Sequence, residues 1–237
     1  MSGVAVRYQQ TLIRILSAIG DKSGAVEDAN KVTLIVVSKT RPVEQIEALY
    51  HLGHRDFGEN YVQELVAKAE ELRRHDCTGI RWHFIGHLQT NKVKALIQHV
   101  YAVHTLDSEK LASELSKRWR GSGREGMLPV FIEVNVDREK SKSGVLPESV
   151  VDFAKSVGQL SELSLQGLMC IPNSENDMVG LQSAFRDLRE LELRCRPWTQ
   201  GKLSMGMSAD FELAIQEGAT HIRVGSAILP RSSAVLG

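Results

Sequence analysis

The sequence predicts an α/β fold, a single (β/α)8 barrel of the TIM type with an extra N-terminal helix. Eight short apolar runs recur at roughly even intervals along the 237 residues, and helical patterns fill the gaps between them. No G-x-G-x-x-G follows the first run, although a dinucleotide-binding open sheet would be expected to carry one there. The expected strands are 33–38, 54–57, 81–85, 100–105, 129–136, 164–170, 201–205 and 220–225.

The expected helices follow from apolar residues at spacings of three and four. The N-terminal helix precedes the first strand, and its predicted inward face is Leu12, Ile15, Leu16 and Ile19. Three later stripes each follow a strand: Val62, Leu65, Val66, Ala69 and Leu72; Leu111, Leu115 and Trp119; and Met178, Leu181, Phe185 and Leu188. Asp107 and Ser108 are both N-cap residue types and lie just before the second of these stripes.

Length and composition fit one domain over residues 1–237, because a barrel of this type typically needs about 250 residues. Apolar residues make up 42% of the chain, which is enough for a sizeable core. An open doubly wound sheet is the alternative, and the count of eight strands favours the barrel. Zero formal net charge gives no electrostatic footprint for nucleic acid or for a membrane surface.

The cysteines indicate the cellular compartment that we expect, and the spacing of the histidines does not predict a metal site. Cys77, Cys170 and Cys195 are an odd number without C-x-x-C spacing, which indicates reduced thiols in the cytoplasm. The eight histidines show no H-x-x-x-H spacing beside a carboxylate, so we expect no metal. No run approaches the length of a membrane span.

The first strand ends in a residue with chemical potential. Residues 34–37 are apolar and mostly β-branched, which is typical of a strand buried on both faces, and Lys39 follows them. The carboxyl end of a barrel strand is where barrel enzymes keep their active sites. Partial desolvation there would lower the pKa of Lys39 and supply a neutral amine for an imine. The alternative is a solvated lysine that merely follows the strand.

The last two strands end in glycine-containing turns that resemble a phosphate site. Barrels often bind phosphate with the loops after strands seven and eight, through backbone N–H groups at a helix start. Residues 204–208 and 223–226 fit this arrangement, although each glycine alone is also explained by a tight turn. A lysine on strand one and a phosphate cradle across the barrel would suit a phosphorylated aldehyde.

Six segments then carry a resemblance to a known family. They are 36–40 (V-V-S-K-T), 57–64 (F-G-E-N-Y-V-Q-E), 82–92 (W-H-F-I-G-H-L-Q-T-N-K), 135–144 (N-V-D-R-E-K-S-K-S-G), 167–172 (G-L-M-C-I-P) and 203–210 (L-S-M-G-M-S-A-D). In this order they resemble the pyridoxal phosphate homeostasis proteins, which share the barrel of the alanine racemase N-terminal domain. The resemblance runs nearly from end to end.

The resemblance implies a role for each matching residue. Lys39 would hold pyridoxal 5′-phosphate as a Schiff base, and Arg223 would face the pyridine nitrogen. Because a guanidinium does not give up its proton, Arg223 would leave that nitrogen unprotonated and make the cofactor a weaker electron sink. The phosphate would be held by Ser204, the backbone around Gly206, and Gly225 with Ser226. Asn60 and His83 would border the ring.

Three functions remain open at this point. The first is a carrier or regulator in intracellular vitamin B6 homeostasis with little or no catalysis, whose partners would be pyridoxal phosphate and apo-enzymes that need it. The second is a pyridoxal-phosphate-dependent amino-acid racemase, and the third is a Schiff-base aldolase. Related racemases use a tyrosine from an extra β-domain across a dimer, and we expect no room for such a domain here. Of the four tyrosines only Tyr61 lies near the proposed face. We therefore expect a monomeric carrier.

Overall fold

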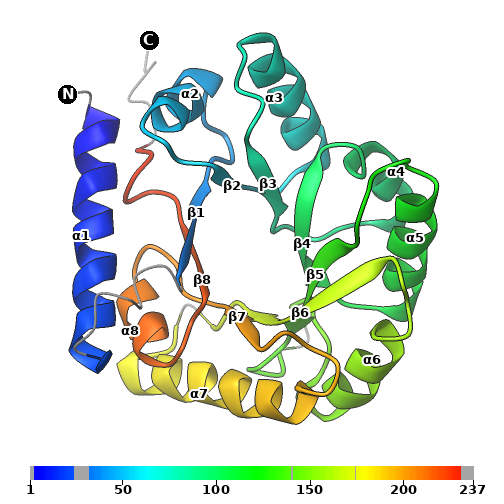
Figure 1. Ribbon diagram of the computed structural model, residues 1–237. Coiled ribbons are helices and arrows are strands. Elements are labelled where there is room, and N and C mark those ends of the chain that lie inside the picture. Colours follow the sequence, from blue (N-terminus) through cyan, green and yellow to red (C-terminus); the bar gives the residue numbers. More distant parts are fainter. Residues whose placement is uncertain (1–2, 24–31, 140, 174, 231–237) are drawn as a thin grey trace.

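The computed structural model describes residues 3–23, 32–139, 141–173 and 175–230. Eight parallel strands form a closed barrel in the order of the sequence, surrounded by helices (Figure 1). The strands are β1 (Thr33–Val37), β2 (Asp56–Glu59), β3 (Arg81–Phe84), β4 (Val100–Leu106), β5 (Leu128–Val134), β6 (Leu163–Cys170), β7 (Lys202–Ser204) and β8 (His221–Val224). This closed order confirms the predicted barrel and rules out the open sheet.

Helices alternate with the strands. They are α1 (Gly3–Ser23), α2 (Val43–His51), α3 (Val62–Arg74), α4 (Val93–Leu96), α5 (Glu109–Arg120), α6 (Val150–Val157), α7 (Met178–Cys195) and α8 (Phe211–Gln216), with single 3₁₀ turns η2 (Thr90–Lys92) and η3 (Pro147–Ser149). Ser108 caps α5 as predicted, because its Oγ accepts a hydrogen bond from the N–H of Leu111. No helix in the described ranges is both long enough and apolar enough to cross a membrane.

The second strand lies two residues later than predicted. The ladder begins at Asp56, which pairs with Arg81 of β3, whereas the sequence pattern placed the start at His54. His54 is buried before the strand and uses its ring for other bonds: its Nδ1 contacts Tyr8 Oη at 3.2 Å, and its Nε2 contacts the carbonyl oxygen of Asp56 at 2.8 Å. The sequence pattern therefore included His54 in the strand, although this residue is buried just before the strand begins.

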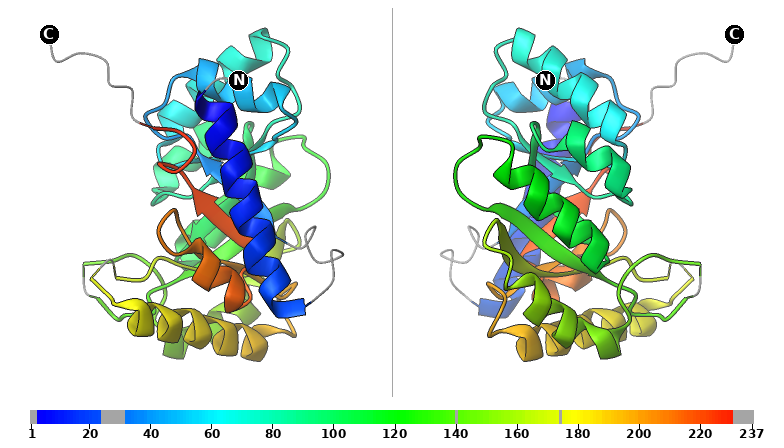
Figure 2. Two further views of the ribbon diagram at one scale, coloured as in Figure 1. Left: turned by 90° about the vertical axis from the view of Figure 1, so that its left-hand side faces the viewer. Right: turned by 90° about the vertical axis from the view of Figure 1, so that its right-hand side faces the viewer.

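The extra helix α1 runs across the outside of the barrel beside α8 and α2 (Figures 1 and 2). Tyr8, Ile15 and Ile19 are buried, as the helical period requires. Leu16 is 52% exposed, so its predicted inward position is wrong; it follows Ile15 by one residue, and one step turns a helical side chain by about 100°. Met178 is likewise exposed, at the first turn of α7.

Parallel pairing brings the first and last strands together. Thr33 pairs with His221 and Val36 pairs with Val224, so β8 closes the barrel onto β1. The carboxyl ends of β1 and β8 are therefore neighbours at one mouth. The phosphate-type turn was expected across the barrel from Lys39, and that expectation is wrong: the turn after β8 lies beside it.

Histidine side chains lie in the interior of the barrel. His104 stacks on Phe131 with ring centroids 4.3 Å apart, and His221 meets the same phenyl ring edge-on at 5.0 Å. Barrel interiors are usually filled by branched apolar side chains. Here imidazole rings share the interior with the phenyl ring of Phe131.

Candidate functional site

One pocket of about 560 Å³ opens at the carboxyl mouth of the barrel. Its wall is built by the segments after β1, β7 and β8: Val37, Lys39, Arg41, Met207, Ser208, Ala209, Arg223, Gly225 and Ser226. Four of the eight predicted site residues, Lys39, Arg223, Gly225 and Ser226, are thus in one place. The volume lies within the range of about 300–1,000 Å³ that small-molecule sites usually have.

Lys39 lies in this wall with an exposed side chain, whereas Ser38 before it is fully buried. The exposed side chain agrees with the alternative of a solvated lysine that follows the strand. Its backbone is closely held, since Ser38 N–H donates to Gly58 O at 3.0 Å and Thr40 N–H donates to Glu64 Oε1 at 2.6 Å.

The turns after β7 and β8 contain two glycines with different tasks. Gly206 has a φ of +92°, and a Cβ there would lie 2.6 Å from Ala214 Cβ, so the turn itself requires glycine. Gly225 lies beside β1, where an added Cβ would stand 3.3 Å from Val37 Cβ. Its N–H donates to Ser208 Oγ at 3.1 Å. Ser208 was not among the predicted site residues, although it follows Gly206 in the same motif.

Arg223 is 4% exposed and is fixed in two directions. Its Nη1 donates to Ser204 Oγ at 2.8 Å, and its Nη2 donates to the carbonyl oxygen of Cys170 at 2.9 Å. The backbone N–H of Arg223 also donates to Gly206 O at 2.9 Å. Ser204 and Gly206 therefore contact Arg223 and do not line the pocket.

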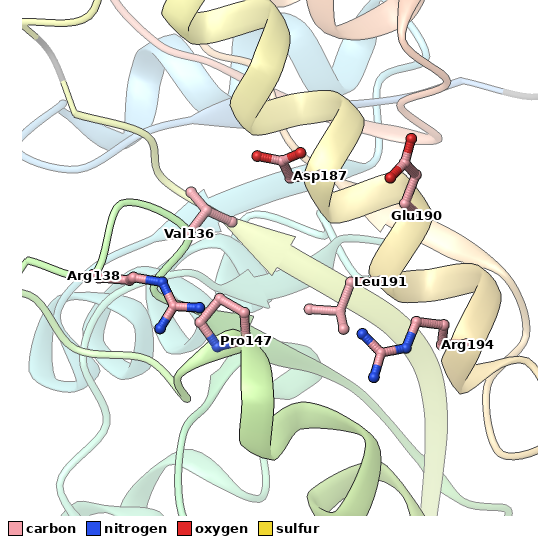
Figure 3. A pocket seen from close by; sticks show the side chains of 7 residues that line it. All are labelled: Val136, Arg138, Pro147, Asp187, Glu190, Leu191 and Arg194. Atoms are coloured by element: carbon pink, nitrogen blue, oxygen red, sulfur yellow. The ribbon is translucent and has the colours of Figure 1, made fainter.

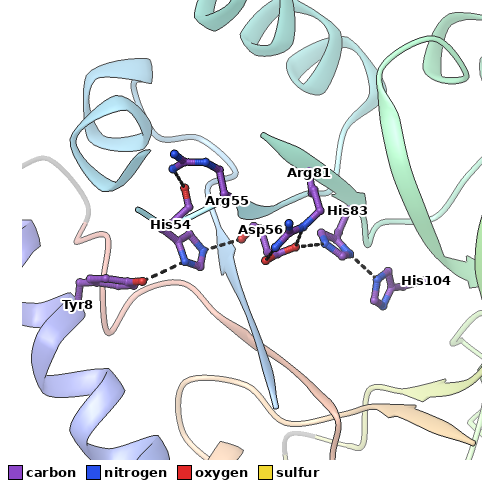
Figure 4. Close-up of polar contacts among 7 residues, drawn as sticks. All are labelled: Tyr8, His54, Arg55, Asp56, Arg81, His83 and His104. Atoms are coloured by element: carbon purple, nitrogen blue, oxygen red, sulfur yellow. Dashed lines mark hydrogen bonds and ion pairs between the residues drawn. The ribbon is translucent and has the colours of Figure 1, made fainter. Parts of the chain in front are cut away.

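Ser204 is the first link of a hydrogen-bonded chain through the barrel interior. His104 Nδ1 lies 2.8 Å from Ser204 Oγ, and His104 Nε2 lies 2.9 Å from His83 Nδ1. His83 Nε2 lies 3.0 Å from Asp56 Oδ1, which also accepts from Arg81 Nε at 2.6 Å (Figure 4). His83 thus sits at the far end of this chain. It lines a separate pocket of about 470 Å³ at the amino mouth, together with Arg81 and His221.

The two ends of the chain fix the direction of every proton in it. The Asp56 carboxylate only accepts, so His83 Nε2 donates to it, and with neutral rings each further bond points from Arg223 towards Asp56. Burial lowers the pKa of His83, and lowers that of His104 further, which keeps both rings neutral. Burial alone would raise the pKa of Asp56, but the hydrogen bonds from Arg81 and His83 lower it overall. Both histidines therefore carry their proton on Nε2.

Asn60 follows β2 and is held by a close backbone approach. A Cβ on Gly86 would lie 2.1 Å from the carbonyl oxygen of Asn60, so only glycine fits after β3. The Oδ1 atom of Asn60 is buried and has no hydrogen-bond partner within the described part of the chain. Such an atom fits a site that is completed by a ligand.

Sequence reasoning missed Glu133 on β5. It is 9% exposed, and its Oε2 has no hydrogen-bond partner among the described atoms. Burial, and next the charge of Asp107, raises the pKa of Glu133 to about 7, although Arg223 acts in the opposite direction. No motif marked this residue, because a single glutamate in an apolar strand has no distinguishing spacing.

The segment after β5 is tied to itself. The Asn135 side chain donates to the carbonyl oxygen of Glu139 at 2.8 Å and accepts from its N–H at 3.1 Å. The Lys142 ammonium lies 2.6 Å from Glu139 Oε1. A pocket of about 280 Å³ lies between this segment and α7, where Arg138 and Arg194 stand among acidic side chains (Figure 3). None of the predicted site residues line it.

One group of described residues has metal-ligand donors close together. Glu47, His51 and Cys77 bring a carboxylate, an imidazole and a thiol within 4.8 Å of one another, outside the barrel. Burial raises the pKa of the Cys77 thiol, which opposes the thiolate form that metals require. Glu47 also lies 3.5 Å from His75 Nδ1. We take this group as an ion-pair cluster.

Comparison with known proteins places the chain among named relatives. The family model "Alanine racemase, N-terminal domain" matches residues 24–230. A pyridoxal phosphate homeostasis protein of Pseudomonas aeruginosa is 41% identical over 228 residues, covering 96% of this chain and 95% of the relative. One from Escherichia coli is 37% identical over 233 residues and covers 96% of each chain.

Solved structures agree with these relatives. PipY of Synechococcus elongatus, solved with pyridoxal phosphate bound, has a TM-score of 0.77 and 31% identity, covering 92% of this chain and 99% of that one. Alanine racemase of Corynebacterium glutamicum is only 13% identical, with a TM-score of 0.68, covering 95% of this chain and 62% of the racemase. That second likeness shows the fold alone.

Proposed function

Because the chain belongs to the family of pyridoxal phosphate homeostasis proteins, we propose that it binds pyridoxal 5′-phosphate in the pocket that Lys39 and Arg223 share. In this proposal the protein serves vitamin B6 homeostasis as a carrier or regulator with little or no catalysis. The observation that carries it is the convergence of an exposed lysine amine, a buried guanidinium and glycine turns on one pocket. The bound state of PipY supports the same ligand.

The proposed roles combine what the family resemblance implies with the contacts of this chain. When bound, the cofactor supplies an electrophilic aldehyde, with which the Lys39 amine forms a Schiff base. Gly225, Ser226 and Ser208 border the space for the phosphate. Arg223, held by Ser204 and by the turn at Gly206, would face the ring nitrogen. Asn60 contributes its buried amide as a neighbour of the ring.

His83 has a different proposed role from the one that the family resemblance implied. It lines the amino-mouth pocket and reaches Arg223 only through His104 and Ser204. We therefore propose that His83 acts on the cofactor indirectly, through the hydrogen-bonded chain, and does not border the ring.

The test is a visible absorption spectrum of the purified protein before and after borohydride reduction. Lys39→Ala should abolish the absorption band of the Schiff base. Peptide mapping of the reduced protein should place the cofactor on the peptide that contains Lys39. A label on Lys92 or Lys142 instead would refute the assignment.

The phosphate site has its own test. Gly225→Val adds a branched side chain at the proposed phosphate position, where Val37 Cβ already lies 3.3 Å from an ideal Cβ. We expect a much larger loss of affinity for pyridoxal phosphate than for pyridoxal, measured by titration. Equal losses for both ligands would mean that this glycine only shapes a turn.

An amino-acid racemase is the second candidate, and Glu133 is the observation that favours it. A buried carboxyl whose pKa is raised to about 7 has the protonation balance of a general acid or base. Opposing this, the guanidinium of Arg223 would leave the ring nitrogen unprotonated. We expect alanine to exchange its α-proton in D₂O very slowly or not at all, as followed by NMR. Turnover of about 1–10³ s⁻¹ would establish the racemase.

The remaining proposals concern partners and compartment. We propose that the protein is a cytoplasmic monomer and that apo-enzymes are the recipients of its cofactor. The thiols of Cys77, Cys170 and Cys195 are all buried and unpaired by disulfides, as a reducing compartment allows. Reactivation of an apo-enzyme by the loaded protein, and sedimentation of the protein alone, test the two proposals separately.

A further inference from the structure

A single buried ammonium holds the chain on both sides of Lys39. Lys68, on α3, lies with its side chain 8% exposed, and its Nζ donates to the carbonyl oxygen of Ser38 at 2.6 Å. The same nitrogen donates to Glu59 Oε1 and to Glu64 Oε1, both at 2.7 Å. An ammonium has three N–H groups, so these three bonds use its whole donor capacity.

The two carboxylates pass this hold on to the residues that flank Lys39. Glu59 is fully buried, and its Oε1 also accepts from Ser38 Oγ at 2.7 Å. Glu64 Oε1 accepts from the N–H of Thr40 at 2.6 Å. Lys68 therefore contacts the residue before Lys39 directly and the residue after it through Glu64.

The backbone at Thr40 needs such a hold. Thr40 has a φ of +59°, and it is the β-branched residue among the non-glycine residues with positive φ in the described ranges. A β-branched side chain is strongly disfavoured in this left-handed conformation, which persists only when surrounding contacts fix it. The N–H bond to Glu64 is such a contact, and it acts one residue after the reactive lysine.

We propose that Lys68 is a positioning residue for Lys39: through Ser38 and Glu64 it fixes the backbone from which the Lys39 amine reaches the aldehyde of the ligand. This inference rests on the proposed function. In the reaction the neutral amine forms the new bond to the aldehyde carbon, and the aldehyde oxygen leaves as water with the two protons of the nitrogen. Lys68 itself touches neither group, so it acts only on geometry.

The test compares two ligands that differ at the aldehyde. Pyridoxal 5′-phosphate can form the imine, whereas 4′-deoxypyridoxine 5′-phosphate keeps the ring and the phosphate but has no aldehyde. The ratio of their affinities measures the contribution of the imine. In Glu64→Ala we expect this ratio to fall about tenfold or more, because the strain at Thr40 is no longer suppressed. Affinity for the deoxy analogue should change less than about threefold.

Lys68→Met tests the ammonium itself and should lower the same ratio, and Glu64→Ala keeps the proposal falsifiable if Lys68→Met does not fold. Gln63→Ala, an exposed neighbour of Glu64 on α3, is the matched control and should leave the ratio unchanged. Stopped-flow trapping with borohydride adds a second readout, since slower imine formation with unchanged analogue binding is a positioning effect.

Each other outcome overturns one specific statement. Equal falls in affinity for both ligands would show that Lys68, Glu59 and Glu64 only support the fold of the pocket. An unchanged ratio in Glu64→Ala would remove the positioning role. If the wild type itself shows no preference for the aldehyde, and Lys39→Ala behaves like the wild type, the proposed function fails instead.

Discussion

Two buried polar clusters each hold one residue of the pocket. One is made of charged groups, and the other consists mainly of neutral groups. Beneath Lys39, between the barrel and α3, an ammonium and two carboxylates make short charged bonds. Behind Arg223, inside the barrel, two neutral imidazoles and a hydroxyl lead to Asp56. The first cluster centres on one nitrogen, whereas the second is a linear chain.

This difference predicts how much stability the protein should lose when a residue of each cluster is substituted. Removing the central ammonium leaves the fully buried carboxylate of Glu59 without its cation, which is costly. Removing a link from the neutral chain loses one or two hydrogen bonds of ordinary strength. Acid distinguishes them too, because burial lowers the pKa of both His83 and His104 and keeps the second cluster free of histidine charge.

The largest effect should come from Lys68→Met. Without the ammonium, Glu59 is a fully buried carboxylate that keeps only the Ser38 hydroxyl as a donor. We expect a loss of about 3–5 kcal/mol in the free energy of unfolding, measured in urea at pH 7. Lys110→Met, at an exposed position of α5, should change it by less than about 0.5 kcal/mol. A similar small change for Lys68 would contradict the charged description of this cluster.

The second-largest effect on stability should come from lowering the pH, through the buried histidines. Burial lowers the pKa of His54 from 6.5 to about 4 and that of His221 to about 3. The unfolded chain therefore binds more protons than the folded chain below pH 6.5. The stability from a neutral His54 is complete above pH 6.5 and is lost as the pH falls towards 4, by roughly 3 kcal/mol.

Unfolding free energies at pH 7, 6, 5 and 4 check this pH dependence. In His54→Gln the decline should be shallower than in the wild type, since one titrating group is gone. Exposed His87 provides the control, because His87→Gln should leave the slope as it is. Parallel curves for wild type and His54→Gln would contradict a neutral, buried His54.

Asp56→Asn should have an intermediate effect. Asp56 is the accepting end of the neutral chain and accepts hydrogen bonds from both Arg81 and His83. Loss of these charge-assisted bonds should cost about 1.5–3 kcal/mol at pH 7. Because the pKa of Asp56 is lowered in the folded protein, its contribution should disappear at strongly acid pH. Asp187→Asn, on the exposed face of α7, is the control and should be nearly neutral.

Ser204→Ala should show the smallest change in stability, about 0.5–1.5 kcal/mol, because it removes a neutral hydroxyl. Its stronger signature is spectroscopic. Nitrogen-15 NMR of the wild type should find His83 and His104 neutral with the proton on Nε2, and Ser204→Ala should shift the His104 Nδ1 resonance. Ser183→Ala on the exposed face of α7 should not. The opposite tautomers would reverse the direction assigned to the chain.

Much of the fold could be predicted because its signals are local. Apolar runs located the strands, with β2 displaced by two residues because His54 is buried without being in the ladder. Helical spacing located α3, α5 and α7, and failed at Leu16 and Met178, where the apolar side chains lie outside the buried face. Motifs with glycine or lysine at strand ends located Lys39 and the turns after β7 and β8.

The sequence by itself predicted a barrel with Lys39 after its first strand, because the apolar runs and their order along the chain are local features of the sequence. Only the tertiary structure decided which residues share the Lys39 pocket. Closure places β8 against β1, so Arg223 joins Lys39, while the strand stagger sends His83 to the other mouth. The alternation of a strand tells which residues point inward, but not at what height they lie. Height depends on the register of every strand in the ring, and the contacts of Lys68 depend likewise on how α3 packs against β1 and β2.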